Sequence, residues 1–95
     1  MRIAVSVDGN EKISKHLGKC KTFLIFEKEN ENVNFGEVRT TDGNHQNHVI
    51  EDIKDCQYVI SAKIGEGMVA NLEKMGIKAV EESETDDPME AVKKI

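Results

Sequence analysis

A short run, Thr22-Phe23-Leu24-Ile25-Phe26-Glu27-Lys28, lies at the centre of the predicted fold. It is rich in β-branched and aromatic residues and shows little alternation, which is typical of a strand covered on both faces. Polar residues follow at positions 29–32. Val33–Thr40 then alternates as a second strand, with Gly36 indicating a β-bulge. The two segments predict a β-hairpin.

The segments on either side of the hairpin predict three further strands and three helices. The expected strands are Arg2–Asp8, Gln57–Ser61 and Ile77–Val80. The expected helices carry Val49, Ile50 and Ile53; Met68, Val69, Leu72 and Met75 on one stripe; and Ala91, Val92 and Ile95. Gly76 occupies the position where a helix commonly ends in a left-handed residue. Asp87 and Pro88 are typical of an N-cap and a first helical position.

The resulting order, βββαβαβα, predicts an α/β fold with a five-stranded mixed sheet. A hairpin followed by two helix–strand repeats combines antiparallel and parallel pairing, and the crossovers should be right-handed. Helices must cover the apolar faces of the sheet. With 95 residues and no visible linker, we expect one domain spanning residues 1–95.

Composition limits the classes of partner. The formal net charge is −5 and the basic residues are scattered, so neither nucleic acid nor an anionic membrane surface is an expected partner. No apolar stretch approaches the length of a membrane span, and no targeting leader is apparent. Two cysteines do not form a disulfide framework. We therefore expect a cytoplasmic protein with free thiols.

Three segments carry candidate metal or cluster donors, and the third of them is Cys56, which precedes a predicted strand. His16 and Cys20 lie in the loop after the first strand, with a glycine between them. His45 and His48 precede the first predicted helix and are three residues apart, so they can share a helical face. Thiolate and imidazole are the donors that metal–sulfur clusters use. The alternatives are a solvated histidine, a packed Cys20, and a buried, inert thiol at Cys56.

Three other patterns favour structural roles over chemistry. The methionines of the second helix are expected to lie in the core. The acidic run Glu81-Glu82-Ser83-Glu84 is expected to be a solvated loop. A glycine pair, Gly65 and Gly67, lacks the further residues of a phosphate-binding loop.

The chain resembles the dinitrogenase iron–molybdenum cofactor biosynthesis family. The resemblance rests on the opening strand, on Ile13-Ser14-Lys15-His16-Leu17-Gly18-Lys19-Cys20, and on the order of later segments such as Asp55–Ile60 and Ile64–Gly67. The family's usual His-Phe-Gly element has Leu17 in place of Phe. The resemblance implies a ribonuclease-H-like three-layer fold and no catalysis. It also implies binding or transfer of iron–sulfur or iron–molybdenum clusters.

Three functions follow as hypotheses. The first is a non-catalytic cluster carrier that uses His16, Cys20, His45 and His48, exchanges its cargo with donor and acceptor proteins, and is a monomer or a weak homodimer. The second is a metal-free regulatory or scaffolding module with an exposed sheet edge. The third, a remote alternative, is a divalent-metal nuclease that would use Asp8.

Overall fold

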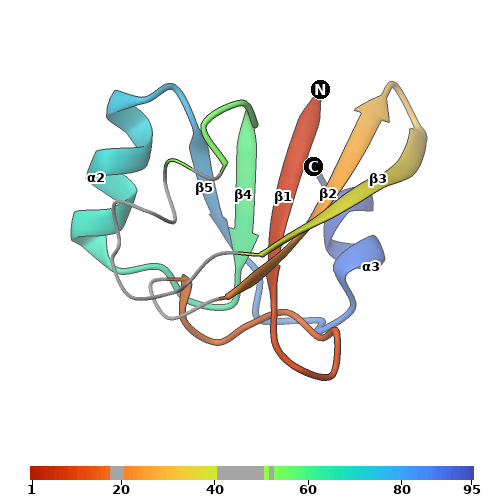
Figure 1. Ribbon diagram of the computed structural model, residues 1–95, viewed down its shortest axis with the longest axis horizontal. Coiled ribbons are helices and arrows are strands. Elements are labelled where there is room, and N and C mark those ends of the chain that lie inside the picture. Colours follow the sequence, from red (N-terminus) through yellow and green to blue (C-terminus); the bar gives the residue numbers. More distant parts are fainter. Residues whose placement is uncertain (18–20, 41–50, 52) are drawn as a thin grey trace.

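The computed structural model describes residues 1–17, 21–40, 51 and 53–95 (Figure 1). In that part of the chain the elements are β1 (Arg2–Val7), β2 (Thr22–Glu29), β3 (Asn32–Thr40), β4 (Tyr58–Ser61), α2 (Glu66–Lys74), β5 (Lys78–Glu81) and α3 (Pro88–Lys93). Each was predicted, to within about two residues at its ends. The helix expected around Val49 and Ile50 falls mostly outside the described residues.

All five strands form one mixed sheet in the order β3-β2-β1-β4-β5. The strand β2 pairs antiparallel with both β1 and β3, while β4 pairs parallel with β1 and with β5. This confirms the predicted α/β class with a five-stranded mixed sheet. The central strand β1 is buried along nearly its whole length, whereas β3 lies at an edge and is mostly exposed.

The two described helices cover opposite faces of the sheet (Figure 1). The first apolar cluster, on the α2 face, includes Ala4, Phe23 and Ile25 together with Met68 and Leu72. The second, on the α3 face, is formed by Ile3, Val5, Val7, Ile13, Phe26, Ile60, Ala91 and Val92. Alternate residues of β1 and β2 therefore face different clusters, which explains why β2 is apolar without alternation.

Local signals in the sequence determine several of the connections. The register of β2 against β3 shifts between Ile25 and Phe26, which leaves Gly36 as the bulged residue. A Cβ at Gly36 would lie 3.1 Å from the carbonyl oxygen of Ile25, so a glycine fits this close approach. Gly76 has φ +78° after α2, and the Asp87 side chain accepts a hydrogen bond from the Met89 amide at 3.0 Å. The bulge and both helix caps are confirmed.

Two predictions about packing were wrong at one residue each, Met75 and Glu82, whereas Glu81, Ser83 and Glu84 are exposed as expected. Met75 is 41% exposed because it follows the last helical residue of α2 as its C-cap and no longer has helical backbone angles. Glu82 is 8% exposed instead of solvated, since its carboxylate forms an ion pair with Lys94 at 3.2 Å and accepts the Glu84 amide. Its neighbour Glu81 accepts the Ile64 amide at 3.0 Å.

Candidate functional site

Strand direction brings the ends of three segments to one side of the sheet. Both β1 and β3 end there and β2 begins there, because β1 and β3 each run antiparallel to β2. Val7 pairs with Thr22, and Thr22 pairs with Thr40, so the three residues form one cross-strand row. Neighbouring strands lie about 4.8 Å apart, so the row spans about 10 Å. In open α/β sheets, ligands bind beyond the carboxyl ends of strands.

His16 is held near this row by a loop that crosses the end of the sheet. Ile13 and Leu17, on either side of His16, are buried in the clusters on opposite faces. Ser14 is fixed between two strands, since its amide donates to the Ser6 carbonyl at 2.8 Å and its carbonyl accepts from the Ala62 amide at 2.9 Å.

The imidazole of His16 is exposed beside these buried anchors. The hydrogen bonds between His16 and Ser14 use only the backbone of His16, at 3.2 and 3.3 Å. Within the described residues no hydrogen bond to the ring is found, and the residue as a whole is exposed. The loop therefore presents a solvent-accessible donor on a rigid support.

The other predicted donors are not placed by the structure. Cys20, His45 and His48 lie outside the described residues. The structure does describe the nearest strand residues. Thr22, the first residue of β2, lies two residues after Cys20, and Thr40, the last residue of β3, lies five residues before His45. Whether the four donors share one site stays a prediction.

Cys56 is a buried thiol, as one alternative predicted. It is 3% exposed, and burial raises its pKa to about 12, with the negative charge of Asp55 acting in the same direction. A thiol with so high a pKa stays protonated at neutral pH, and the thiolate is the form that binds metal. Cys56 is therefore a packing residue of the cluster on the α2 face.

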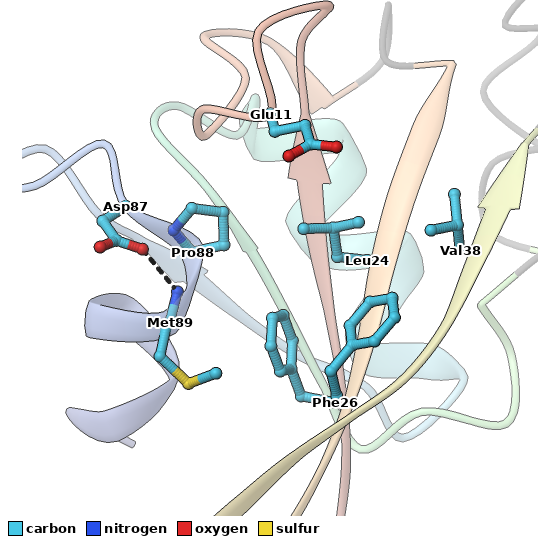
Figure 2. Close-up of a pocket in the computed structure, with 8 residues that line it drawn as sticks. Glu11, Leu24, Phe26, Val38, Asp87, Pro88 and Met89 are labelled. Carbon is cyan, nitrogen blue, oxygen red and sulfur yellow. Dashed lines mark hydrogen bonds between the residues drawn. The ribbon is translucent and has the colours of Figure 1, made fainter.

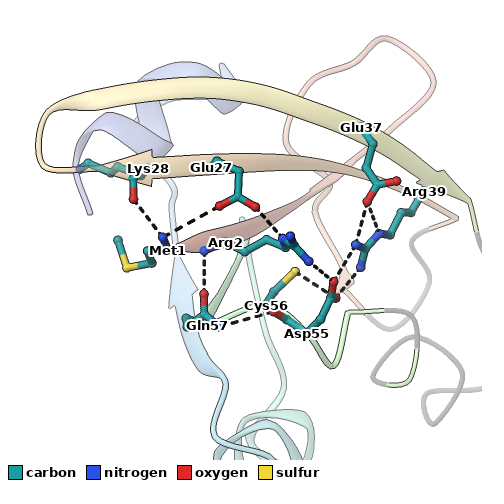
Figure 3. A network of polar contacts seen from close by, with 9 residues as sticks. All are labelled: Met1, Arg2, Glu27, Lys28, Glu37, Arg39, Asp55, Cys56 and Gln57. Carbon is teal, nitrogen blue, oxygen red and sulfur yellow. Dashed lines mark hydrogen bonds and ion pairs between the residues drawn. The ribbon is translucent and has the colours of Figure 1, made fainter.

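A network of ion pairs joins the two ends of the segment that carries the other histidines (Figure 3). Arg39, next to the last residue of β3, makes a bidentate pair with Asp55, with one N–O distance of 2.8 Å. Arg2 of β1 donates to Asp55 and to Glu27 of β2, and Arg39 also pairs with Glu37 at 2.8 Å. The two guanidinium groups, Arg39 first, hold the pKa of Asp55 far below its usual range.

Sequence reasoning missed this network. Its members come from β1, β2, β3 and the turn before β4, and no short spacing relates them. Only the sheet register places Arg2 opposite Glu27. The sequence does show two arginines on predicted strands of an acidic chain. Charge sign alone, however, does not identify which carboxylates pair with them.

A hollow of about 480 Å³ lies beside the loop that carries His16. Ile13, Lys15 and Ala62 line one part of it, and residues 82–86 line the rest. Its carboxylates are balanced by lysines: Lys94 pairs with Glu84 at 3.3 Å, as it does with Glu82. The hollow is thus lined by paired charges and lies at the carboxyl end of the parallel strands.

The described residues give no support to a nuclease centre. Among them, no group of three or more His, Cys, Asp or Glu side chains is arranged to hold a metal ion. Asp8, the carboxylate considered for that role, accepts the amides of Asn10 at 2.8 Å and Lys12 at 3.2 Å. It therefore organises its own turn.

No helix in the described part of the chain is long and apolar enough to cross a membrane.

Known proteins are similar to this chain in sequence and in fold. The FeMo cofactor biosynthesis protein NifB of Bradyrhizobium diazoefficiens is 30% identical over 89 residues, which cover 84% of this chain and 18% of that protein. The chain thus spans less than a fifth of this relative's length. The crystal structure of PH0822 superposes with a TM-score of 0.75 at 26% identity, covering 85% of this chain and 78% of the other.

A second solved structure has the same fold over nearly the full chain. It is mj0327 of Methanocaldococcus jannaschii, provisionally described as a dinitrogenase, with a TM-score of 0.73, 22% identity, and coverage of 98% of this chain and 84% of the other. The family model described as dinitrogenase iron-molybdenum cofactor matches residues 1–95. The chain therefore belongs to the dinitrogenase iron–molybdenum cofactor family.

Proposed function

We propose that this chain is a non-catalytic module that binds an iron–sulfur or iron–molybdenum type cluster and passes it between a donor and an acceptor protein. Membership of a family related to the iron–molybdenum cofactor supports a role in cofactor biosynthesis or binding. We infer the carrier role and the kind of cluster from that membership and from the side of the sheet where β1 and β3 end and the loop of His16 lies.

One observation carries the proposal. His16 is exposed on a loop anchored by Ile13 and Leu17 at the carboxyl end of β1. On the same side of the sheet, the segments of the other predicted donors depart from the row formed by Val7, Thr22 and Thr40. An exposed imidazole on a rigid support is suited to ligand exchange, because a cargo must be both held and released. We propose that Cys20 supplies a thiolate and that His45 and His48 complete the set.

The two cysteines offer a matched test of this ligand set. After anaerobic reconstitution with iron and sulfide, with and without molybdate, the wild-type protein should show the visible absorption of a bound cluster. Cys20→Ala and the double variant His45→Ala/His48→Ala should lose most of it, and His16→Ala should weaken it. Cys56→Ala should retain it, because that thiol is buried and protonated.

Two results would count against the proposal. One is a folded wild-type protein that stays colourless under all these conditions. The other is equal loss of absorption in Cys56→Ala and Cys20→Ala, since that would assign the effect to damaged packing. Circular dichroism of each variant separates unfolding from loss of a ligand.

The second candidate function is a metal-free regulatory or scaffolding module. The exposed edge strand β3 favours it, because an edge strand can contact a protein partner without metal. Protein binding that is unchanged by chelators and by Cys20→Ala would favour this function over the carrier.

We further propose that the chain is a single domain of ribonuclease-H-like topology, cytoplasmic, and a monomer or weak homodimer. The free thiol of Cys56 and the net charge of −5 support a reducing compartment and a protein partner instead of nucleic acid. Cell fractionation tests the compartment, and light scattering tests the oligomeric state.

A further inference from the structure

A groove of about 440 Å³ lies between the start of α3 and the outer part of the sheet (Figure 2). Its floor is a block of four apolar side chains from two paired strands. Leu24 of β2 pairs with Val38 of β3, and Phe26 pairs with Phe35. Val38 and Phe35 are 54% and 52% exposed, the largest exposures among the large apolar side chains in the described part of the sheet.

The bulge at Gly36 is what assembles this floor. In a regular strand, residues three apart point to opposite faces. The extra residue in β3 reverses that relation, so Phe35 and Val38 both lie on the face where Leu24 and Phe26 lie. Phe35 also contacts Phe26 edge to face, with ring centroids 5.8 Å apart, which holds its ring in place.

The far wall is formed by the first turn of α3. Pro88 and Met89 line the groove there, and because α3 is six residues long it leaves β3 uncovered. An exposed apolar surface of this kind, beside polar residues, marks a site of interaction.

Two carboxylates border the groove. Asp87 lies at the helix cap, and Glu11 projects above Leu24 from a turn closed by Asp8 (Figure 2). Neither carboxylate has an ion-pair partner in the described residues, whereas nearby Lys12 and Asp86 pair with each other at 3.3 Å. Together with the net charge of −5, this border attracts a basic partner and repels a second copy of the chain.

We infer that this groove binds a segment of a partner protein that presents a large apolar side chain next to lysine or arginine. The apolar side chain fills the space over Phe35 and Val38, and the basic residue faces Glu11 and Asp87. The bulge distorts the outer edge of β3, so the groove, and not strand addition at that edge, is the contact. The inference holds whether or not a cluster is bound.

The test is a titration of the ¹⁵N-labelled, metal-free chain with three short peptides, followed by amide chemical shifts. The peptides contain Lys-Ile-Phe-Lys, Glu-Ile-Phe-Glu or Lys-Ser-Ser-Lys. The first should shift the amides of Leu24, Phe35, Val38 and Met89 and bind at least about fivefold tighter than the other two, because it alone combines both features.

Matched variants separate the contribution of the apolar floor to peptide binding from that of the two carboxylates. Phe35→Thr and Val38→Thr keep strand propensity and should weaken binding of the first peptide by about tenfold. Glu11→Gln/Asp87→Asn keeps the helix cap while removing both charges and should weaken it about three- to tenfold. Met75→Gln, at an exposed methionine on α2, should leave binding unchanged.

Four outcomes would overturn the inference. The first two are equal binding of the three peptides and binding unaffected by the groove variants. The third is concentration-dependent shifts of the same amides without peptide, which would identify a second copy as the occupant. The fourth is shifts confined to the outer edge of β3, which would replace the groove by strand addition.

Discussion

Asp55 shows how a single exposed carboxylate can connect side chains from separate elements. It accepts from Arg39 and Arg2 at once, although its side chain is 41% exposed. Surface ion pairs usually contribute little, but bidentate geometry and a network are the conditions under which they contribute measurably. Here the network connects β1 and β3 to the turn that precedes β4.

Asp55→Asn should lower the free energy of unfolding by about 1 kcal/mol at pH 7, after allowance for solvent screening. Because the folded-state pKa of Asp55 is depressed, its contribution is complete above the unfolded value of about 3.9 and is lost as pH falls below it. Urea unfolding at pH 7 and pH 3 should therefore show a difference between wild type and variant that shrinks in acid.

Glu73→Gln is the control for that measurement, since Glu73 is exposed on α2 and outside the network. A difference between wild type and Asp55→Asn that is as large at pH 3 as at pH 7 would show that Asp55 acts by packing and not by charge.

Lys28 has an unusual position for a lysine. It is 8% exposed, and its ammonium donates to the carbonyls of Val92, Lys93 and Ile95 at the end of α3, the first two at 3.3 Å. It thus donates to carbonyls at the end of a helix that belongs to another element, although the Val92 carbonyl also accepts the Ile95 amide at 3.2 Å, and it complements the helix dipole.

Lys28→Met should keep the apolar stem but remove the ammonium donor from the carbonyls of Lys93 and Ile95, at a cost of about 1–2 kcal/mol. Chemical denaturation measures the loss, and hydrogen exchange should locate it in α3. Lys78→Met, at an exposed site on β5, should change stability by less than about 0.5 kcal/mol. Equal effects of the two substitutions would contradict the capping role.

Helix α2 has a glycine near each end, and the two glycines differ in backbone conformation. Gly67 is helical, and a Cβ there would meet nothing within 4 Å, whereas Gly76 has φ +78°. Gly67→Ala should therefore stabilise the protein by about 0.5–1 kcal/mol, and Gly76→Ala should destabilise it by about 1 kcal/mol. Thermal unfolding of the two variants, compared with wild type, should give shifts of opposite sign; a shared sign would be inconsistent with these backbone conformations.

Those elements were predictable because their signals are local. A cap at Asp87, a left-handed residue at Gly76 and a bulge at Gly36 each depend on a few adjacent residues, and all three were confirmed. The ion pair of Arg39 with Asp55 and the capping of α3 by Lys28 depend on sheet register, which periodicity does not supply.

In the candidate site, too, some features follow from local sequence and others depend on how the strands pair. Sequence order located His16 after the first strand, and the structure adds that its loop crosses the sheet between two buried anchors. That the segments of Cys20 and His45 join the sheet in one row follows from pairing of Val7, Thr22 and Thr40, which no motif revealed.

For the whole molecule, the sheet order separates two surfaces with different proposed roles. The loop that carries His16 lies at the carboxyl end of β1, and β3 ends on the same side of the sheet; there we propose the cluster. The apolar groove lies on the α3 face over β2 and β3, where we infer a partner. A carrier needs a site for its cargo and a surface for its partner. The variants proposed for each surface do not alter residues of the other.

The most direct measurement is the iron, molybdenum and acid-labile sulfide content of the protein purified without oxygen. We predict iron and sulfide in comparable molar amounts in the wild type and in Cys56→Ala, and their loss from Cys20→Ala. A folded wild-type protein that contains neither, both as purified and after reconstitution, would contradict the proposal that this chain carries a metal–sulfur cluster.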